Sequence, residues 1–208
     1  MTLDINSEWQ RARQIVEETG MSLFLTGKAG TGKTAFLRRL KEDSPKRMIV
    51  LAPTGIAAIN AGGMTLHSFF QLPFTPFVPD TVINGNGSRL RLGKEKIRII
   101  RSMDLLVIDE VSMIRADLLD AVDDMLRRYR SKSEPFGGGR LLLIGDLQQL
   151  APVVKEDEWA LLKQHYASAF FFHSKALAAT RYVTIELKHV YRQQDREFVD
   201  LLNRVREN

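Results

Sequence analysis

The chain contains no cysteine among its 208 residues. Disulfide bonds and zinc sites built on cysteine are therefore excluded. No apolar run approaches the ~18 residues that a membrane-spanning helix requires. Segment 1–10 is polar and acidic, unlike a signal peptide, which is basic and then apolar. We expect an intracellular protein without a membrane partner, in the cytoplasm or nucleoid of a bacterium or in the nucleus or mitochondrion of a eukaryote.

Acidic residues are outnumbered by basic ones, which gives a formal net charge of +5. A basic balance favours an anionic partner such as nucleic acid, but it fits a mildly basic soluble enzyme equally well. The hydrophobic fraction of 44% is ordinary for a globular protein. The length fits one large domain, or one domain with a small insertion.

Short apolar runs alternate with helical patterns along the chain. Four of five runs are continuously apolar at their centres, as in strands that are covered on both faces. Between 114 and 129, apolar residues recur every three or four positions, which indicates one face of a helix. This alternation predicts an α/β fold with a parallel sheet and helices on both faces. The predicted strands are 22–26, 48–52, 105–109, 141–145 and 183–187.

One stretch, 71–93, breaks this alternation. It holds Pro73, Pro76 and Pro79, followed by an Asn-Gly-Asn-Gly turn at 84–87. These residues predict a loop or hairpin. The stretch is too long for a simple connection inside a compact sheet. We therefore expect an insertion that projects from the core.

Residues 27–34 read GKAGTGKT and match the phosphate-loop pattern G-x-x-x-x-G-K-[ST]. An apolar strand leads into this segment and a helical pattern leads out, a context that an incidental glycine-rich turn does not explain. Backbone N–H groups and the helix N-terminus would face phosphate oxygens. Lys33 would bridge the β- and γ-phosphates, and Thr34 would place its hydroxyl on Mg²⁺. The expected nucleotide contacts are Gly27, Ala29, Gly30, Thr31, Gly32, Lys33 and Thr34.

Two carboxylates, Asp109 and Glu110, end the apolar run LLVIDE. Asp109 is expected to face the Mg²⁺, through water, and Glu110 to orient or deprotonate the attacking water. The alternative is a strand that ends in two solvated acids. The pair favours hydrolysis over transfer to a small acceptor. A further run ends in GDLQQL, where Gln149 is the candidate γ-phosphate sensor or, alternatively, a surface glutamine.

Five segments in this order resemble the Pif/RecD-like superfamily 1 DNA helicases, with the Pif branch the closer match. The resemblance covers nearly the whole chain except 71–100. It implies a RecA-like phosphate-loop NTPase fold, the cofactors ATP and Mg²⁺, and hydrolysis coupled to 5′-to-3′ movement on single-stranded DNA and duplex unwinding. The segments are GKAGTGKT (27–34), APTGIAAINAGGMTLHSFF (52–70), VIDEVSM (107–113), FGGGRLLLIGDLQQLAPV (136–153) and LKHVYRQQDREFVDLLNRVR (187–206).

The resemblance assigns two further nucleotide contacts. Gln10 matches a glutamine that reads the adenine, although Ser7 and Gln10 also form a capping-box pattern, and both readings can hold. Arg192 matches an arginine that reaches the γ-phosphate and stabilises charge in the transition state. An ordinary surface arginine is the alternative.

The segment after the second strand resembles the family's single-strand contact motif. The Thr54 hydroxyl and nearby N–H groups would bind a DNA phosphate. Phe69 would stack on a base or pack in the core. Phe70 is expected in the core. The predicted DNA contacts are Pro53, Thr54, Gly55, Thr65, His67, Ser68 and Phe69.

The resemblance also implies a domain plan. Residues 1–71 and 97–208 would form the first motor domain, and 72–96 a small inserted wedge. Basic residues at alternating spacing there predict either a phosphate-facing strand edge or a solvated charged edge. The second motor domain is missing, so we expect a fragment that is weakly active alone, from a monomeric protein that acts on single-stranded DNA and forks. The basic residues are Arg89, Arg91, Lys94, Lys96 and Arg98.

Rival functions remain open at this point. Another phosphate-loop ATPase without unwinding activity explains the loop and the acids, but not the DNA-contact segment. A nucleotide-gated DNA-binding module leaves Glu110 unexplained. A nucleoside kinase needs an acceptor pocket that the sequence does not suggest.

Overall fold

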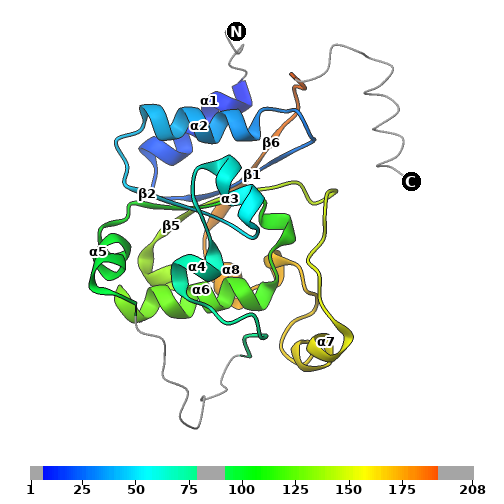
Figure 1. Ribbon diagram of the computed structural model, residues 1–208. Coiled ribbons are helices and arrows are strands. Elements are labelled where there is room, and N and C mark those ends of the chain that lie inside the picture. Colours follow the sequence, from blue (N-terminus) through cyan, green and yellow to red (C-terminus); the bar gives the residue numbers. More distant parts are fainter. Residues whose placement is uncertain (1–6, 79–91, 192–208) are drawn as a thin grey trace.

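The computed structural model describes residues 7–78 and 92–191. Its centre is a six-stranded parallel sheet in the order β3-β2-β4-β5-β1-β6 (Figure 1). The predicted RecA-like α/β fold is thereby confirmed. The strands are β1 (Ser22–Gly27), β2 (Met48–Ala52), β3 (Met64–Thr65), β4 (Leu105–Ile108), β5 (Arg140–Ile144) and β6 (Tyr182–Leu187).

Helices follow the strands as the right-handed connections of a parallel sheet require. The helix predicted between 114 and 129 is α6. Three short 3-10 turns, Val111–Met113, Pro135–Gly138 and Phe171–His173, lie in the loops. The helices are α1 (Ser7–Glu18), α2 (Lys33–Asp43), α3 (Gly55–Ala61), α4 (Leu66–Phe70), α5 (Lys94–Ser102), α6 (Ala116–Tyr129), α7 (Glu156–Leu162) and α8 (Lys175–Ala178).

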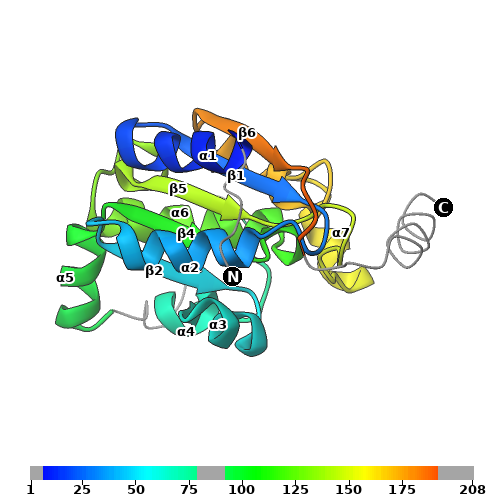
Figure 2. The same cartoon turned by 90° about the horizontal axis from the view of Figure 1, so that it is seen from above.

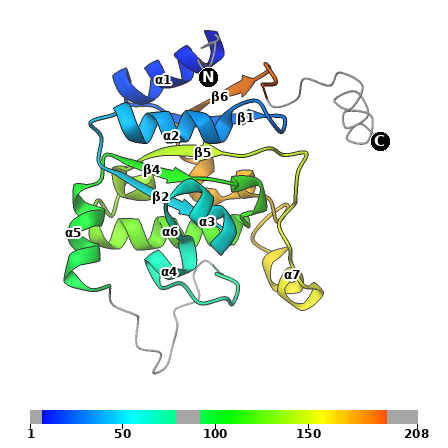
Figure 3. The same ribbon diagram turned by 45° about the horizontal axis from the view of Figure 1, so that its top comes forward.

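The two faces of the sheet are covered by different helices, because successive strand residues point to opposite faces. In β1, Leu23 and Leu25 join a core cluster with α1 and α2, whereas Phe24 joins the cluster with α4, α5, α6 and α8. Figure 3 shows α1 and α2 above the sheet and α4 and α6 below it. A strand buried on both faces has to be apolar throughout, which explains the continuous apolar runs.

Strand polarity places the candidate functional residues at one end of the molecule. All strands run parallel, so their carboxyl ends meet at one edge of the sheet, near α7 (Figure 2). The phosphate loop follows β1, the acid pair follows β4 and Gln149 follows β5 at that edge. Helix α5 lies by the opposite, amino edge (Figure 2).

The predicted basic strand edge is wrong for the residues that the structure describes. Lys94, Lys96 and Arg98 lie in the helix α5, while Arg89 and Arg91 fall outside the described residues. Apolar residues at 97 and 100 share a helical face, and Ile100 is fully buried in the core cluster beneath the sheet. This helical burial overrides the alternating pattern of the charges.

The described ends of the predicted wedge pack on the motor domain. Leu92 is buried in the core, and the backbone N–H of Phe77 donates to Asp117 of α6 at 3.0 Å. The wedge prediction thus rests on 79–91, which lie outside the described residues. No helix among the described residues is long and apolar enough to span a membrane.

Candidate nucleotide-binding and DNA-contact site

The phosphate loop joins the end of β1 to the start of α2. Gly27, Gly30 and Gly32 have φ angles of 149°, 79° and 92°, a region that favours glycine. A Cβ at Gly27 would lie 2.5 Å from the carbonyl oxygen of Leu187 in β6. Leu187 of β6 therefore abuts the loop, which cannot accept a side chain at Gly27. Gly32 precedes α2 as its N-cap and has no side chain, so no side chain competes for the first N–H groups of the helix.

Lys33 lies folded against its own loop. Its ammonium donates to the carbonyl oxygens of Gly27 at 2.6 Å and Lys28 at 3.2 Å. The Thr31 hydroxyl also donates to Lys28, at 2.8 Å. These bonds close the loop into a ring with the lysine charge at its mouth. Thr34 is exposed in the first turn of α2, beside that charge.

Asp109 follows β4 at the edge where Lys33 lies, and only 7% of it is exposed. Burial, together with the charge of Glu110, raises the pKa of Asp109 to about 6. The Glu110 N–H, which donates to Asp109 at 3.0 Å, and the Lys33 charge oppose that rise. The Lys33 charge therefore acts on Asp109, the first of the two predicted acids. A nearby cation would favour the charged carboxylate.

Glu110 has a φ of 52° and a ψ of 43°, in the left-handed region that few residues other than glycine adopt. Such a conformation costs of order 1–3 kcal/mol and is held only by the surrounding structure. Here Val111 and Ser112 after it are buried. The turn separates the two carboxylates: Asp109 stays buried and Glu110 is half-buried.

These residues fit a Mg²⁺–nucleotide complex. The described part of the chain has no cluster of three or more His, Cys, Asp or Glu side chains that could hold a metal alone. Mg²⁺ in phosphate-loop proteins needs no such cluster, because substrate phosphates and water supply most ligands. A hydroxyl at Thr34 and a buried carboxyl at Asp109 supply the protein's share.

Gln149 follows β5 on the same edge. Its side-chain amide donates to Asp146 at 3.0 Å, and its backbone N–H donates to the carbonyl of the same residue at 3.0 Å. Asp146 is 4% exposed, while Gln149 is exposed. The sensor candidate is therefore oriented by a buried acid that the sequence did not single out. The role of Gln149 toward the γ-phosphate stays a prediction.

Gln10 lies on an exposed face of α1, whose position is fixed by the ring of Trp9 packed edge-on against Phe36 of α2 at 5.1 Å. The Ser7 hydroxyl donates to Glu8 at 3.3 Å, so the capping box stays a prediction. Arg192 lies outside the described residues. Its neighbour Tyr191 places its ring 3.5 Å from the Cβ position of Gly32.

The DNA-contact candidates after β2 include two helix caps. Thr54 caps α3 by accepting from the N–H of Ala57 at 3.2 Å, and Thr65 caps α4 by accepting from that of Ser68 at 3.2 Å. A hydroxyl accepts and donates at the same time, so capping leaves phosphate contact possible. Pro53 is half-buried, whereas Gly55 and Ser68 are exposed.

The ring of His67 stacks on that of Phe74, with centroids 4.6 Å apart. Phe69 corrects the stacking prediction: it is 5% exposed, packs edge-on against Phe70 and has the Lys96 ammonium over its ring at 5.6 Å. A ring enclosed in this way cannot stack on a base. Phe70 is fully buried, as predicted.

Comparison with known proteins decides the family. The model described as "PIF1-like helicase" matches residues 6–207. The chain belongs to the PIF1-like helicase family. It is 37% identical to the ATP-dependent DNA helicase PIF1 of Candida albicans, over 91% of this chain and 21% of the relative. With the human ATP-dependent DNA helicase PIF1 it shares 37% identity over 90% of this chain and 27% of that protein.

A solved Pif1 helicase from Bacteroides, in complex with ADP-AlF3 and ssDNA, is 41% identical and covers 99% of this chain and 47% of that chain, with a TM-score of 0.92. The chain thus spans about a fifth to a quarter of these curated relatives and slightly less than half of the solved helicase. In this chain the phosphate loop, the acid pair and Gln149 all lie at the carboxyl edge of the parallel sheet.

Two site features of this PIF1-like chain escaped sequence reasoning. In the sequence, Asp146 is one more acidic residue in a loop. Only the structure shows that it is buried and accepts a hydrogen bond from the Gln149 side chain. Leu187 ends a strand that is far from the phosphate loop in sequence, yet its carbonyl abuts Gly27. The pairing of β1 with β6 creates that contact, and no local pattern signals strand order.

Proposed function

We propose that this chain is the first motor domain of an ATP-dependent DNA helicase of the PIF1-like family. In the intact protein, ATP with Mg²⁺ would bind at the phosphate loop, in a cleft that a second motor domain completes. Hydrolysis would drive 5′-to-3′ movement along single-stranded DNA and the opening of forks, with the protein acting as a monomer. The single observation that carries the proposal is the buried Asp109 beside the Lys33 charge at the mouth of the loop.

The chain's own residues divide the work at this site. The Lys33 ammonium, now donating to two loop carbonyls, is the group that would turn toward phosphate oxygens. Thr34 and Asp109 would hold Mg²⁺, which screens the phosphate charge when bound. Glu110 would accept a proton from the attacking water, and Gln149 and Arg192 would contact the γ-phosphate.

The edge of the sheet also supports coupling to DNA. Thr54 follows β2, the strand next to the acid strand β4, and Thr65 ends β3, the strand beyond β2. A shift at the acid pair can therefore reach the DNA-contact segment through two neighbouring strands. Steps along DNA would follow from opening and closing of the motor domains.

The test is steady-state ATP hydrolysis by the intact protein, with and without single-stranded DNA. We expect single-stranded DNA to stimulate hydrolysis, and Glu110→Gln to lower the stimulated rate by ~100-fold or more while nucleotide binding persists. The alternative is a nucleotide-gated DNA-binding module or an ATPase that does not unwind. Unchanged turnover in Glu110→Gln would support the module, and DNA-independent turnover would support another ATPase class.

A further inference from the structure

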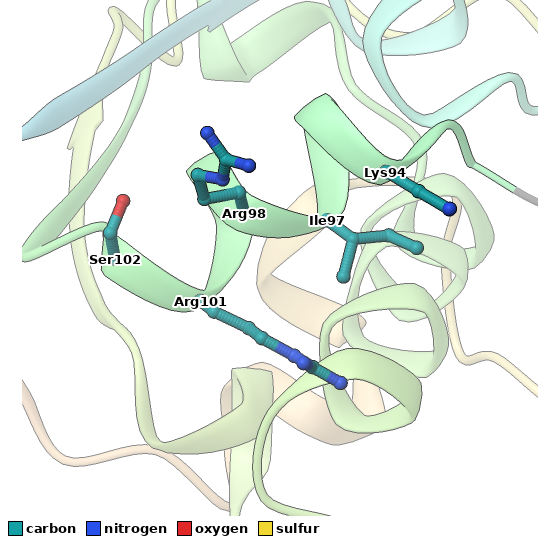
Figure 4. A pocket seen from close by; sticks show the side chains of 5 residues that line it. All are labelled: Lys94, Ile97, Arg98, Arg101 and Ser102. Carbon is teal, nitrogen blue, oxygen red and sulfur yellow. The ribbon is translucent and has the colours of Figure 1, made fainter.

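Helix α5 carries a basic face whose charges have no acidic partner among the described residues. Arg98 and Arg101 lie four and seven positions after Lys94, which places the three residues on one side of the helix. With Ile97 and Ser102 they line a hollow of about 540 Å³. Figure 4 shows Lys94 and Ser102 at opposite ends of this hollow, with Arg98 and Arg101 between them.

Lys96 is not part of this basic face, because its ammonium binds backbone carbonyl groups of the protein itself. Its ammonium donates to the carbonyl oxygens of Ser68 at 2.8 Å and Phe69 at 2.9 Å, at the end of α4. Arg101 donates from Nε to the carbonyl of Tyr129 at 3.2 Å, a neutral partner that fixes the side chain and leaves its charge uncompensated. Within the described ranges, Lys94 and Arg98 have no hydrogen bond or ion pair.

Several helical arginines elsewhere in the molecule pair with an acid. Arg39 with Asp43 on α2, and Arg127 and Arg128 with Asp123 and Asp124 on α6, form ion pairs four residues apart. On α5 the residue four positions before Arg98 is instead Lys94, so like charges repel along that face. Lys94 also lies in the first turn of the helix, where the helix dipole disfavours a cation. The face is thus built at a cost that an anionic partner would remove.

We propose that the Lys94–Arg98–Arg101 face is a docking surface for the phosphodiester backbone of duplex DNA. The three residues cover about 10 Å along the helix axis, from a rise of ~1.5 Å per residue. Each DNA strand presents one phosphate per ~3.4 Å of its axis, so three cations meet neighbouring phosphates.

Two observations favour a duplex over a single strand. The hollow contains no aromatic side chain, so it offers no platform on which unpaired bases would stack. Helix α5 also lies by the amino edge of the sheet, away from the carboxyl edge that carries the single-strand candidates Thr54 and Thr65 (Figure 2). The choice of DNA as the anion rests on the proposed function. The surface would hold the paired arm of the substrate while the opposite edge holds the unpaired strand.

The test compares the intact protein with its K94Q/R98Q variant. Binding of a blunt duplex is measured by fluorescence anisotropy across a salt series, without nucleotide. Both side chains are exposed, so the fold is expected to be retained, which the melting temperature checks. We expect duplex affinity to fall by roughly tenfold at low salt, and the slope of log affinity against log salt to shrink by about two. Affinity for oligothymidine and the DNA-stimulated ATPase should not change.

The matched control is K163Q/R181Q, which removes two exposed cations elsewhere on the surface. An equal loss of duplex binding in this control would overturn the proposal, because net charge alone would then explain the effect. An unchanged salt slope in K94Q/R98Q would also overturn it. If single-stranded DNA fails to stimulate ATP hydrolysis in the unaltered protein, the proposed function fails instead. The salt dependence of duplex binding still tests the Lys94–Arg98–Arg101 face in that case.

Discussion

The backbone N–H of Tyr191 donates a 2.9 Å hydrogen bond to the carbonyl oxygen of Gly30. This bond joins the segment after β6 to the phosphate loop after β1. The two strands pair along six residues, from Ser22 opposite Tyr182 to Gly27 opposite Leu187. Strand pairing thus brings the end of the described chain to the mouth of the loop, where the family resemblance needs an arginine.

Arg192 follows Tyr191 directly, so we predict that Arg192→Ala slows ATP hydrolysis in the intact protein by about 10³-fold, as for arginines that stabilise phosphoryl transfer elsewhere. Nucleotide affinity should change far less, since the charge acts mainly in the transition state. Single-turnover hydrolysis and nucleotide titration separate the two effects. Arg181→Ala, an exposed arginine just before β6, is the control and should leave both unchanged.

Gly27→Ala should both destabilise the domain and abolish nucleotide binding. The added Cβ would meet the Leu187 carbonyl oxygen at 2.5 Å and the Thr31 hydroxyl at 2.7 Å, at a φ of +149°. Backbone strain of this kind costs about 1–3 kcal/mol. Urea unfolding and nucleotide titration measure the two losses. Gly20→Ala has open space around its Cβ and serves as the control. Equal stability of the two variants would refute the close contact between β6 and the loop.

The contrast between Lys33 and Phe69 shows what local sequence can and cannot predict. The phosphate loop is one contiguous segment, so residue types at fixed spacing are enough to place Lys33 beside phosphate-binding N–H groups. The five-residue helix α4 offers no such guide, because one turn does not show which side faces the core. Phe69 is covered by Lys96, which is distant in sequence. Its burial follows from tertiary packing alone.

The strands and α5 show the same division. The run at β2 was predicted with the observed bounds, and the other four predicted runs agree with the strands to within one residue at each end, because burial on both faces requires continuous apolar residues. The two-residue strand β3 has too few residues for a periodic pattern. In α5 the charges alternate, and only the burial of Ile100 against the sheet settles the helix. Sequence predicts what contiguous residues determine, whereas contacts between distant segments need the structure.

Asp120→Ala should be among the most destabilising substitutions outside the nucleotide site. Asp120 is 7% exposed and accepts from the Tyr166 hydroxyl at 2.8 Å, the Ser174 hydroxyl at 2.5 Å and the N–H groups of Lys175 and Ala176 at 3.2 and 3.0 Å. Removing the carboxylate leaves these buried donors unsatisfied, at about 3 kcal/mol.

Urea unfolding measures the loss, and Asp124→Ala on the same helix is the matched control. Asp124 makes one exposed ion pair with Arg128, which contributes less than about 1 kcal/mol. Burial and the contact with Asp120 raise the pKa of Tyr166 well above its ordinary value, so the phenol stays a donor. Similar losses in the two variants would show that the Asp120 network does not stabilise α8 and its neighbours.

The environment of His67 leads us to predict that the free energy of unfolding falls in mild acid. Burial, and then the charge of Arg115, lower the pKa of His67, while Asp117 opposes them. The unfolded chain, whose histidine has a pKa of ~6.5, therefore binds the proton more readily than the folded one. The stability from the neutral ring is complete above about pH 6.5 and is lost as the pH falls through the lower, folded-state pKa. Unfolding free energies measured by urea titration at about pH 7.5 and about pH 5 test this.

Two variants of His67 serve as controls. His67→Phe keeps an aromatic ring to stack on Phe74 but cannot titrate, and His67→Asn removes both the ring and the titrating group. Both variants should lose part of the acid sensitivity although they differ in stability, and an undiminished pH dependence in His67→Phe would assign it to other groups.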